Sequence, residues 1–241
     1  MSDFKGKVIA ITGGGSGQGR ALATLLAERG ALVSLADVNE AGLQDTIKSL
    51  NNSSEHIATK VDVRKSAEVN SWISKTVEKY GKLDGAANWA GVIRVNPTVD
   101  MSDEDWNFVM DVNSTGVFNC IRAQLRVMKD GASIVSAASS EGQIGWPTFT
   151  AYCASKHAVI GLSRSAAKEH VGIRINCVAP GCTDTPMMAN DTLENSDEIK
   201  AQIQKRKADP KEIIRVAAFL LSDEASFVTG AVWNVDGGWI C

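Results

Sequence analysis

Short apolar runs alternate with amphipathic stretches along most of the chain. The run Val8–Thr12 is nearly continuous in apolar residues, as in a parallel strand that is covered on both faces. A glycine cluster follows it, and then a stretch with helical spacing of leucines. Further strands are expected at Ala31–Ala36, His56–Val61, Asp84–Asn88, Ser133–Ala137 and Ile173–Ala179, and helices at Arg20–Arg29, Ala41–Leu50, Glu104–Met128 and Ala151–Val171. This alternation predicts an α/β fold, an open, doubly wound parallel sheet between two helix layers.

The pattern continues across the whole chain without a linker or an internal repeat. At 241 residues the chain lies at the top of the usual range for one domain, so a single domain spanning residues 1–241 is expected. The segment 186–210 breaks the rhythm, because it follows a strand but is polar and charged. It is either a plain surface segment or a lid over a ligand at the carboxyl ends of the strands.

Composition narrows the function classes. The net charge of −3 gives no reason to expect nucleic acid or an anionic membrane as a partner. The five cysteines form an odd set without a C-x-x-C pair, and the three histidines lack ligand spacing, so neither a disulfide framework nor a metal site is expected. The amino terminus does not resemble a signal peptide, and no apolar run reaches about 18 residues. A cytoplasmic protein is expected.

Three glycines, Gly13, Gly17 and Gly19, lie between the first expected strand and the first expected helix. Glycine permits a tight turn and lets a pyrophosphate approach the backbone at a helix amino terminus. The spacing is T-G-x-x-x-G-x-G, from Thr12 to Gly19, rather than the usual G-x-G-x-x-G. A turn without a ligand is the alternative, but the strand–turn–helix context favours a dinucleotide site.

Asp37 ends the second expected strand, twenty positions after Gly17. A carboxylate there can accept hydrogen bonds from the adenosine ribose hydroxyls and would repel the extra phosphate of NADP. Arg20 does not reverse this preference, because it falls within the first helix. The alternative for Asp37 is a cap of the helix over Asn39–Leu50. The sequence therefore predicts NAD over NADP.

Tyr152 and Lys156 lie four positions apart, on one face of an expected helix. A nearby ammonium group stabilises a phenolate and lowers the tyrosine pKa from about 10, which makes Tyr152 a candidate general acid or base. Ser139 ends the strand thirteen residues earlier and can reach the same carbonyl oxygen. Asn113 is an unfavourable residue within an expected helix, where a buried amide can hold a relay water. A solvated pair, a turn serine and a core asparagine are the respective alternatives.

With these motifs the chain resembles the short-chain dehydrogenases/reductases, from Lys5 to about Trp239. The resemblance implies a Rossmann-like fold, a nicotinamide cofactor and a catalytic tetrad of Asn113, Ser139, Tyr152 and Lys156. It places Asp62 and Val63 at the adenine ring, and the NVDGG segment Asn234–Gly238 at the last strand and turn. The implied cofactor contacts are Gly13, Ser16, Gly17, Gln18, Gly19, Asp37, Asp62, Val63, Asn88, Ala90, Gly91, Tyr152, Lys156, Pro180, Gly181, Thr183 and Thr185.

Three residues depart from the family pattern. Trp89 replaces a small or polar residue and Gln18 an apolar one, while Glu141 adds an acid near Ser139. For Glu141 an exposed loop carboxylate is favoured over a ligand for a polar or cationic substrate. The expected pocket wall suggests a hydrophobic or cyclic carbonyl compound, since it combines residues 143–150, including Trp146 and Phe149, with Trp89, Ile93, Met187 and Met188.

The expected activity is hydride transfer between NAD and a carbonyl or secondary alcohol. Two alternatives stay open: a dehydratase or epimerase of the same fold, and a non-catalytic NAD-binding scaffold. By resemblance, the helices over 104–128 and 151–171 form the interfaces of a homotetramer, with a homodimer as the second possibility. The alternative is that all of their apolar residues face the sheet. The apolar final segment, Ala231–Cys241, is a further candidate contact with a partner chain.

Overall fold

All strands of the sheet run parallel. The computed structural model describes residues 3–188 and 197–241, and its seven strands lie in the order β3-β2-β1-β4-β5-β6-β7. β1 therefore lies inside the sheet, between β2 and β4, and the chain winds outward from it in both directions, which confirms the doubly wound sheet. The strands are β1 (Val8–Thr12), β2 (Leu32–Asp37), β3 (Ile57–Lys60), β4 (Gly85–Asn88), β5 (Ser133–Ala137), β6 (Arg174–Pro180) and β7 (Val232–Val235).

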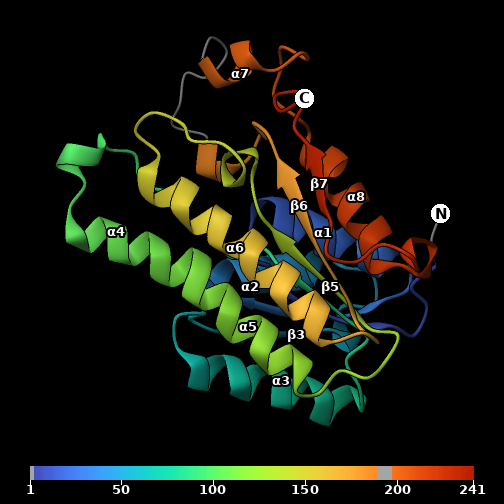
Figure 1. Ribbon diagram of the computed structural model, residues 1–241. Helices are drawn as coiled ribbons and strands as arrows, with labels where there is room; N and C mark the ends of the chain where they lie inside the picture. The colour runs from blue at the N-terminus through green and yellow to red at the C-terminus, as the bar shows by residue number, and fades with distance from the viewer. Residues whose placement is uncertain (1–2, 189–196) are drawn as a thin grey trace.

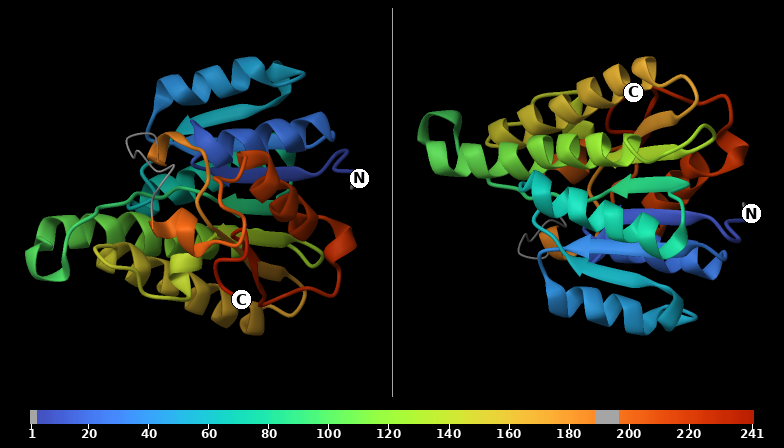
Figure 2. Two further views of the ribbon diagram at one scale, coloured as in Figure 1. Left: turned by 90° about the horizontal axis from the view of Figure 1, so that it is seen from above. Right: turned by 90° about the horizontal axis from the view of Figure 1, so that it is seen from below.

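Helices cover both faces of this sheet (Figures 1 and 2). One buried cluster joins the sheet to α3, α5 and α6, and includes Trp72, Ile121 and Val159. A second joins the opposite face to α1, α2 and α8, and includes Leu22 and Leu43. The helices are α1 (Gly17–Glu28), α2 (Glu40–Ser49), α3 (Ser66–Tyr80), α4 (Asp103–Met110), α5 (Gly116–Leu125), α6 (Thr150–Glu169), α7 (Asp197–Ala201) and α8 (Pro210–Leu221).

The expected elements are present, with two differences that bear on the site. The first helix begins at Gly17 rather than Arg20, so the end of the glycine cluster is already helical. The helix expected over Glu104–Met128 is interrupted, because the π-helical turn Asp111–Thr115 lies between α4 and α5. A π turn carries an extra residue and is frequent at functional sites. Asn113 lies at its centre.

A buried polar cluster ties the centre of the sheet to α5. The side chains of Asn88 and Gln124 exchange two hydrogen bonds, of 2.8 and 3.3 Å, and the Asn88 amide also donates to Ser136 Oγ on β5 over 3.3 Å. All three side chains are buried. Their polar atoms therefore depend on one another, because water does not reach them.

Replacing Asn88 by alanine should lower the free energy of unfolding by about 1–3 kcal/mol, because the buried Gln124 amide then loses its partner. Denaturant unfolding followed by tryptophan fluorescence measures this. The double variant Asn88→Ala/Gln124→Leu should recover part of the loss, since it removes both polar groups. A single variant as stable as the wild type would contradict this account.

Candidate active site

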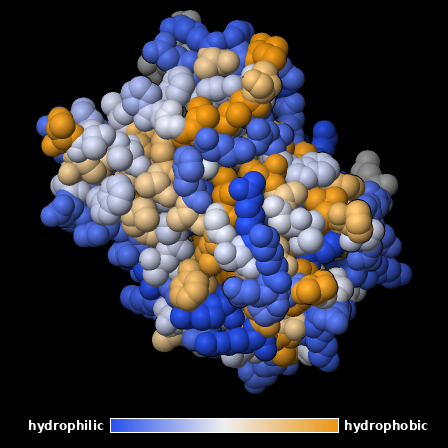
Figure 3. Space-filling view, viewed as in Figure 1, coloured by the Kyte–Doolittle hydropathy of each residue, from blue (hydrophilic) through white to orange (hydrophobic). Residues whose placement is uncertain are grey.

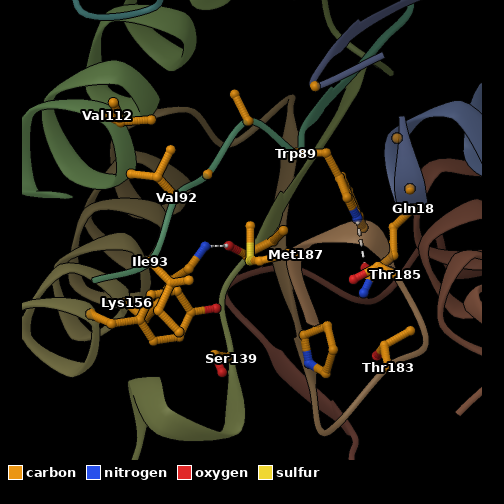
Figure 4. Close-up of a pocket in the computed structure, with 18 of the residues that line it drawn as sticks. Gln18, Trp89, Val92, Ile93, Val112, Ser139, Lys156, Thr183, Thr185 and Met187 are labelled. Atoms are coloured by element: carbon orange, nitrogen blue, oxygen red, sulfur yellow. Dashed lines mark hydrogen bonds between the residues drawn. The ribbon is translucent and has the colours of Figure 1, made fainter. Parts of the chain in front are cut away.

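The carboxyl ends of the parallel strands meet at one edge of the sheet, and a cavity of about 480 Å³ opens there. Residues that follow β1, β2, β4, β5 and β6 line it. In doubly wound sheets a ligand binds where the strand order reverses, here between β1 and β4. Figure 4 shows Lys156 and Ser139 on one side of this cavity and Gln18 and Trp89 on the other.

The cavity brings together nearly all of the residues that the sequence singles out. Ser139, Tyr152 and Lys156 line it, and so do the expected cofactor residues other than Asn88. Asn88 differs from them: its side chain is buried beside Gln124, where it holds β4, and does not line the cavity, so its contact with a cofactor stays a prediction. Asn113 is likewise buried outside the lining.

The turn after β1 is too tight for side chains. Gly13 has φ +69°, and a Cβ there would lie 2.8 Å from the carbonyl carbon of Trp89. Gly19 packs so closely on Gly13 that a Cβ would overlap the Gly13 carbonyl oxygen. Ser16 is the N-cap of α1 but makes no side-chain cap, and the first turn holds no acidic residue. The helix amino terminus therefore suits an anionic group such as a pyrophosphate.

Asp37 lies at the end of β2, beside this turn. Its two carboxylate oxygens accept hydrogen bonds from the backbone N–H groups of Gly15 and Asn39, each over 2.9 Å. The cap of α2 is Asn39, whose side chain accepts from Gly42, so the cap alternative for Asp37 is wrong. The Arg20 guanidinium is held by the Gly15 carbonyl and Thr46 Oγ1, over 2.5 and 2.9 Å. The Arg20 guanidinium is thus hydrogen-bonded within the protein, to the turn and to α2.

A second group of contacts locks the ends of β1 and β4 together. The Thr12 hydroxyl oxygen accepts from the backbone N–H groups of Trp89 and Ala90, over 3.0 and 3.1 Å. The Trp89 indole N–H donates to Gln18 Oε1 over 3.0 Å, as the dashed line in Figure 4 shows. The two departures from the family pattern, Trp89 and Gln18, are therefore partners of one another.

The two catalytic candidates on α6 lie one turn apart, next to Ser139 at the end of β5. Lys156 Nζ donates to the Ala137 carbonyl over 2.8 Å and lies 5.5 Å from the centroid of the Tyr152 ring. Lys156 is buried, at 4% exposure. Burial lowers the pKa of its ammonium group to about 8, because the charged form loses hydration.

Tyr152 differs from the sequence-based expectation. Burial raises the pKa of its phenol above the usual value, the negative charge of Glu141 adds to this, and a hydrogen bond with Ser139 acts in the opposite direction. The net shift is therefore upward, opposite to the shift expected from Lys156 alone, because desolvation outweighs the other influences. Tyr152 is therefore a neutral phenol near pH 7, the form that can donate a proton.

Asn113, in the π turn, is fixed by three hydrogen bonds to Val92 after β4 and Ser155 on α6. Its Oδ1 accepts from the Val92 N–H over 2.8 Å, and its Nδ2 donates to the Val92 carbonyl over 2.9 Å and to Ser155 Oγ over 3.0 Å. A Cβ placed on Gly91 would lie 3.5 Å from Asn113 Oδ1 and 3.6 Å from Lys156 Nζ. Asn113 thus lies beside Lys156, with Gly91 between them.

Glu141 corrects another expectation. It belongs to the short turn Ser140–Gly142, is only 8% exposed and lines the cavity, so it is not an exposed loop carboxylate. The Ser139 hydroxyl donates to Glu141 Oε2 over 3.2 Å. Burial raises the pKa of this carboxyl to about 7. The sequence shows its nearness to Ser139 but not its burial.

The expected pocket wall is present only in part. Trp89, Ile93, Phe149 and Met187 line the cavity. Trp146 stands behind the lining: it donates to Glu198 Oε1 over 3.0 Å and packs edge-on against Trp239, with ring centroids 5.0 Å apart. The described residues Gln143 and Thr150 do not line it either. Glu198 and Trp239 do, although no local pattern in the sequence indicates them.

The expected lid is described only at its two ends. Pro186, Met187 and Glu198 line the cavity, while residues 189–196 lie outside the described residues and Met188 is described only as the end of the turn Pro186–Met188. A cover over the ligand thus stays a prediction. Within residues 3–188 and 197–241, no cluster of three potential metal ligands occurs. No helix in these ranges is long and apolar enough to cross a membrane.

Comparison with known proteins gives consistent relatives. The chain is 44% identical to "Short-chain dehydrogenase/reductase aba4" of Botryotinia fuckeliana, over 99% of this chain and 98% of the relative. It is 38% identical to cyclohexanol dehydrogenase of Acinetobacter sp. strain SE19, over 98% and 96% of the two chains.

Solved structures agree with the fold. The crystal structure of levodione reductase superposes with a TM-score of 0.91 at 37% identity, covering 97% of both chains. A short-chain dehydrogenase from Burkholderia cenocepacia, solved in complex with NADP, gives 0.93 at 27% identity, covering 98% of both. A family model described as "Enoyl-(Acyl carrier protein) reductase" matches residues 13–240. The chain therefore belongs to the short-chain dehydrogenase/reductase family.

Proposed function

We propose that this oxidoreductase interconverts a cyclic, largely apolar secondary alcohol and its ketone, with NAD as cofactor and Tyr152 as the proton-transfer residue. The observation that carries the proposal is one cavity lined both by the glycine turn and by Ser139, Tyr152 and Lys156. The named activity of the cyclohexanol relative supports a cyclic substrate, as do the apolar side chains of Ile93 and Phe149.

The proton-transfer chemistry follows from the burial of Tyr152 and Lys156, which shifts the pKa of each side chain. A neutral Tyr152 donates its proton to the carbonyl oxygen during reduction and takes it back during oxidation. Ser139 donates a hydrogen bond to the same oxygen and stabilises charge that develops there. Lys156, held by the Ala137 carbonyl, places a cation beside the phenol and stabilises the phenolate once the proton has left. The nicotinamide ring, when bound, gives or takes the hydride.

The residues around the cavity fit a dinucleotide. The uncapped start of α1 suits the pyrophosphate, and Asp37 suits the ribose hydroxyls of the adenosine. Asp62 and Val63 would border the adenine ring, and Ala90, Gly91, Pro180, Gly181, Thr183 and Thr185 the nicotinamide half. Arg64 also lines the cavity but is paired with Asp62 over 2.6 Å. Arg20 is bound to the turn and Arg64 to Asp62, so both guanidinium groups are already paired rather than placed to bind the extra phosphate of NADP. This pairing supports NAD over NADP.

The two rival functions have less support. A dehydratase or epimerase in this pocket needs a further acid or base placed at a second substrate carbon, whereas the additional buried carboxyl in the cavity, Glu141, is hydrogen-bonded to Ser139. A non-catalytic scaffold has no use for Lys156 buried beside Tyr152, since burying an ammonium group is costly. Absorbance of NADH with a panel of cyclic ketones and alcohols separates the three functions.

Replacing Tyr152 by phenylalanine should lower turnover by at least about 100-fold, because the ring stays while the transferable proton is lost. NADH absorbance measures turnover, and fluorescence titration should show largely unchanged NADH binding. Tyr80, the other tyrosine of the chain, provides the control: it bonds the Glu55 carbonyl, and Tyr80→Phe should leave turnover near the wild-type value. Wild-type turnover in Tyr152→Phe would overturn the proposed mechanism.

Replacing Asp37 by alanine should raise the Kd for NAD by about tenfold or more and relax discrimination against NADP. A hydrogen bond to a charged group contributes about 1.5–3 kcal/mol, and the carboxylate no longer repels a phosphate. Asp45→Ala removes an equal charge from the exposed side of α2 and should leave both constants unchanged. An unmodified protein that prefers NADPH by about tenfold would contradict the role given to Asp37.

A homotetramer, or failing that a homodimer, is proposed for the assembly. Most of the apolar residues on the helices that suggested it are buried against the sheet, but Phe118 on α5 is 42% exposed and Trp233 on β7 is 37% exposed. On the face that carries α4, α5 and α6, apolar residues break the polar surface in small clusters (Figure 3). These exposed aromatic side chains support a contact with partner chains.

Light scattering at micromolar concentration should therefore give a mass near four times the 25.6 kDa of one chain. In the proposed assembly a partner chain covers the exposed Phe118 ring. Phe118→Glu places a charge in that contact and should shift the mass toward smaller species. A single 25.6 kDa species in the wild type would contradict the assembly and leave the catalytic proposal unaffected.

A further inference from the structure

The Ser139 hydroxyl has a neighbour that the proposed reaction does not use. Its Oγ donates to Glu141 Oε2 over 3.2 Å and accepts from the Glu141 backbone N–H over 3.3 Å. Both residues line the cavity, and both are buried. The carboxyl of Glu141 and the reacting oxygen of a substrate therefore compete for the same hydroxyl.

A serine hydroxyl carries one proton. If Glu141 is ionised, its carboxylate can only accept, and the Ser139 proton points toward it. The lone pairs of Ser139 would then face the substrate oxygen, which gives no stabilisation of negative charge. If Glu141 is neutral, its own O–H can donate to Ser139 Oγ across the same pair of oxygens. The proton of Ser139 is then free to turn toward the substrate.

The surroundings of Glu141 make both forms accessible near neutrality. Burial raises the pKa of this carboxyl to about 7, with the charge of Glu198 on α7 acting in the same direction. The hydrogen bond from Ser139 and the charge of Lys156 on α6 act in the opposite direction. Tyr152 and Cys153 on α6 and Cys182 after β6 are the other titratable groups whose charges couple to it.

We propose that Glu141 is a positioning residue whose protonation sets the direction of the Ser139 hydrogen bond, so that Ser139 donates to the reacting oxygen only while Glu141 is neutral. This inference rests on the proposed function, in which Ser139 is the donor. Glu141 thus acts on the reaction through the Ser139 hydroxyl.

The expected consequence is a fall in kcat for ketone reduction as the pH rises through about 7. One pH unit above the pKa, about one molecule in eleven still carries the neutral acid, so kcat should fall about tenfold between pH 6 and pH 8. Loss of one donor to a developing oxyanion costs about 100- to 1000-fold, so a tenfold decrease lies within what Ser139 can contribute.

Glu141→Gln is the first test, because the amide donates to Ser139 Oγ at every pH. Its kcat for reduction should no longer fall near pH 7, and a remaining fall should lie near pH 8, where Lys156 loses its proton. Glu198→Gln is the matched control, since it removes a carboxylate that lines the cavity but has no contact with Ser139. In that variant the fall in kcat should persist and move to lower pH, because the charge of Glu198 helps to raise the Glu141 pKa.

Ser139→Ala separates this role from a direct effect of the Glu141 charge on Tyr152. The residual kcat of Ser139→Ala should be low and should no longer fall near pH 7, because Glu141 has lost the group through which it acts. A fall near pH 7 that persists in Ser139→Ala, or in Glu141→Gln, would overturn the proposal.

Thermal melting and NADH fluorescence titration show whether each variant folds and holds the cofactor. If Glu141→Gln does not fold, the comparison of the wild type with Ser139→Ala still decides. Failure of the proposed function has a different signature, since it would show as wild-type turnover in Tyr152→Phe or as no ketone reduction in the wild type at any pH.

Discussion

The parallel direction of all seven strands is the constraint on which the site depends. It places every carboxyl end at one edge, so residues from distant parts of the chain meet without long connections. The turn after β1, the acid at the end of β2 and the serine after β5 all reach the same cavity from the ends of their strands. The close packing of Gly13 on Gly19 then brings the start of α1 to that edge.

Desolvation governs the chemistry within the cavity. It acts on Glu141, Tyr152 and Lys156 in the same sense, because for each of them it favours the neutral form. The acid and the phenol therefore hold their protons more tightly, while the ammonium group holds its proton less tightly. A site of this kind keeps the acid and the phenol ready to donate protons near neutral pH.

The sequence predicts the repeating parts of the structure well and the exceptions poorly. β1 and β5 extend over the residues that the apolar runs indicate, and the four-residue spacing brings Tyr152 and Lys156 to one face of α6. Burial of Glu141 could not be predicted, because it depends on the packing of α6 and β6 against a short turn. Glu198 and Trp239 reach the cavity through tertiary contacts that leave no local pattern.

The π turn at Asp111–Thr115 makes this part of the chain intolerant of the deletion of a residue. Periodicity cannot reveal such a turn, since one extra residue resembles ordinary scatter in an amphipathic pattern. Deleting one residue there would restore an α-helix but rotate α5 by about 100° against the sheet. Its buried face, with Cys120 and Ile121, would then turn toward solvent. Surface loops of this chain can tolerate insertions and deletions, but the π turn and α5 cannot. The position of Asn113 depends on the extra residue of the π turn.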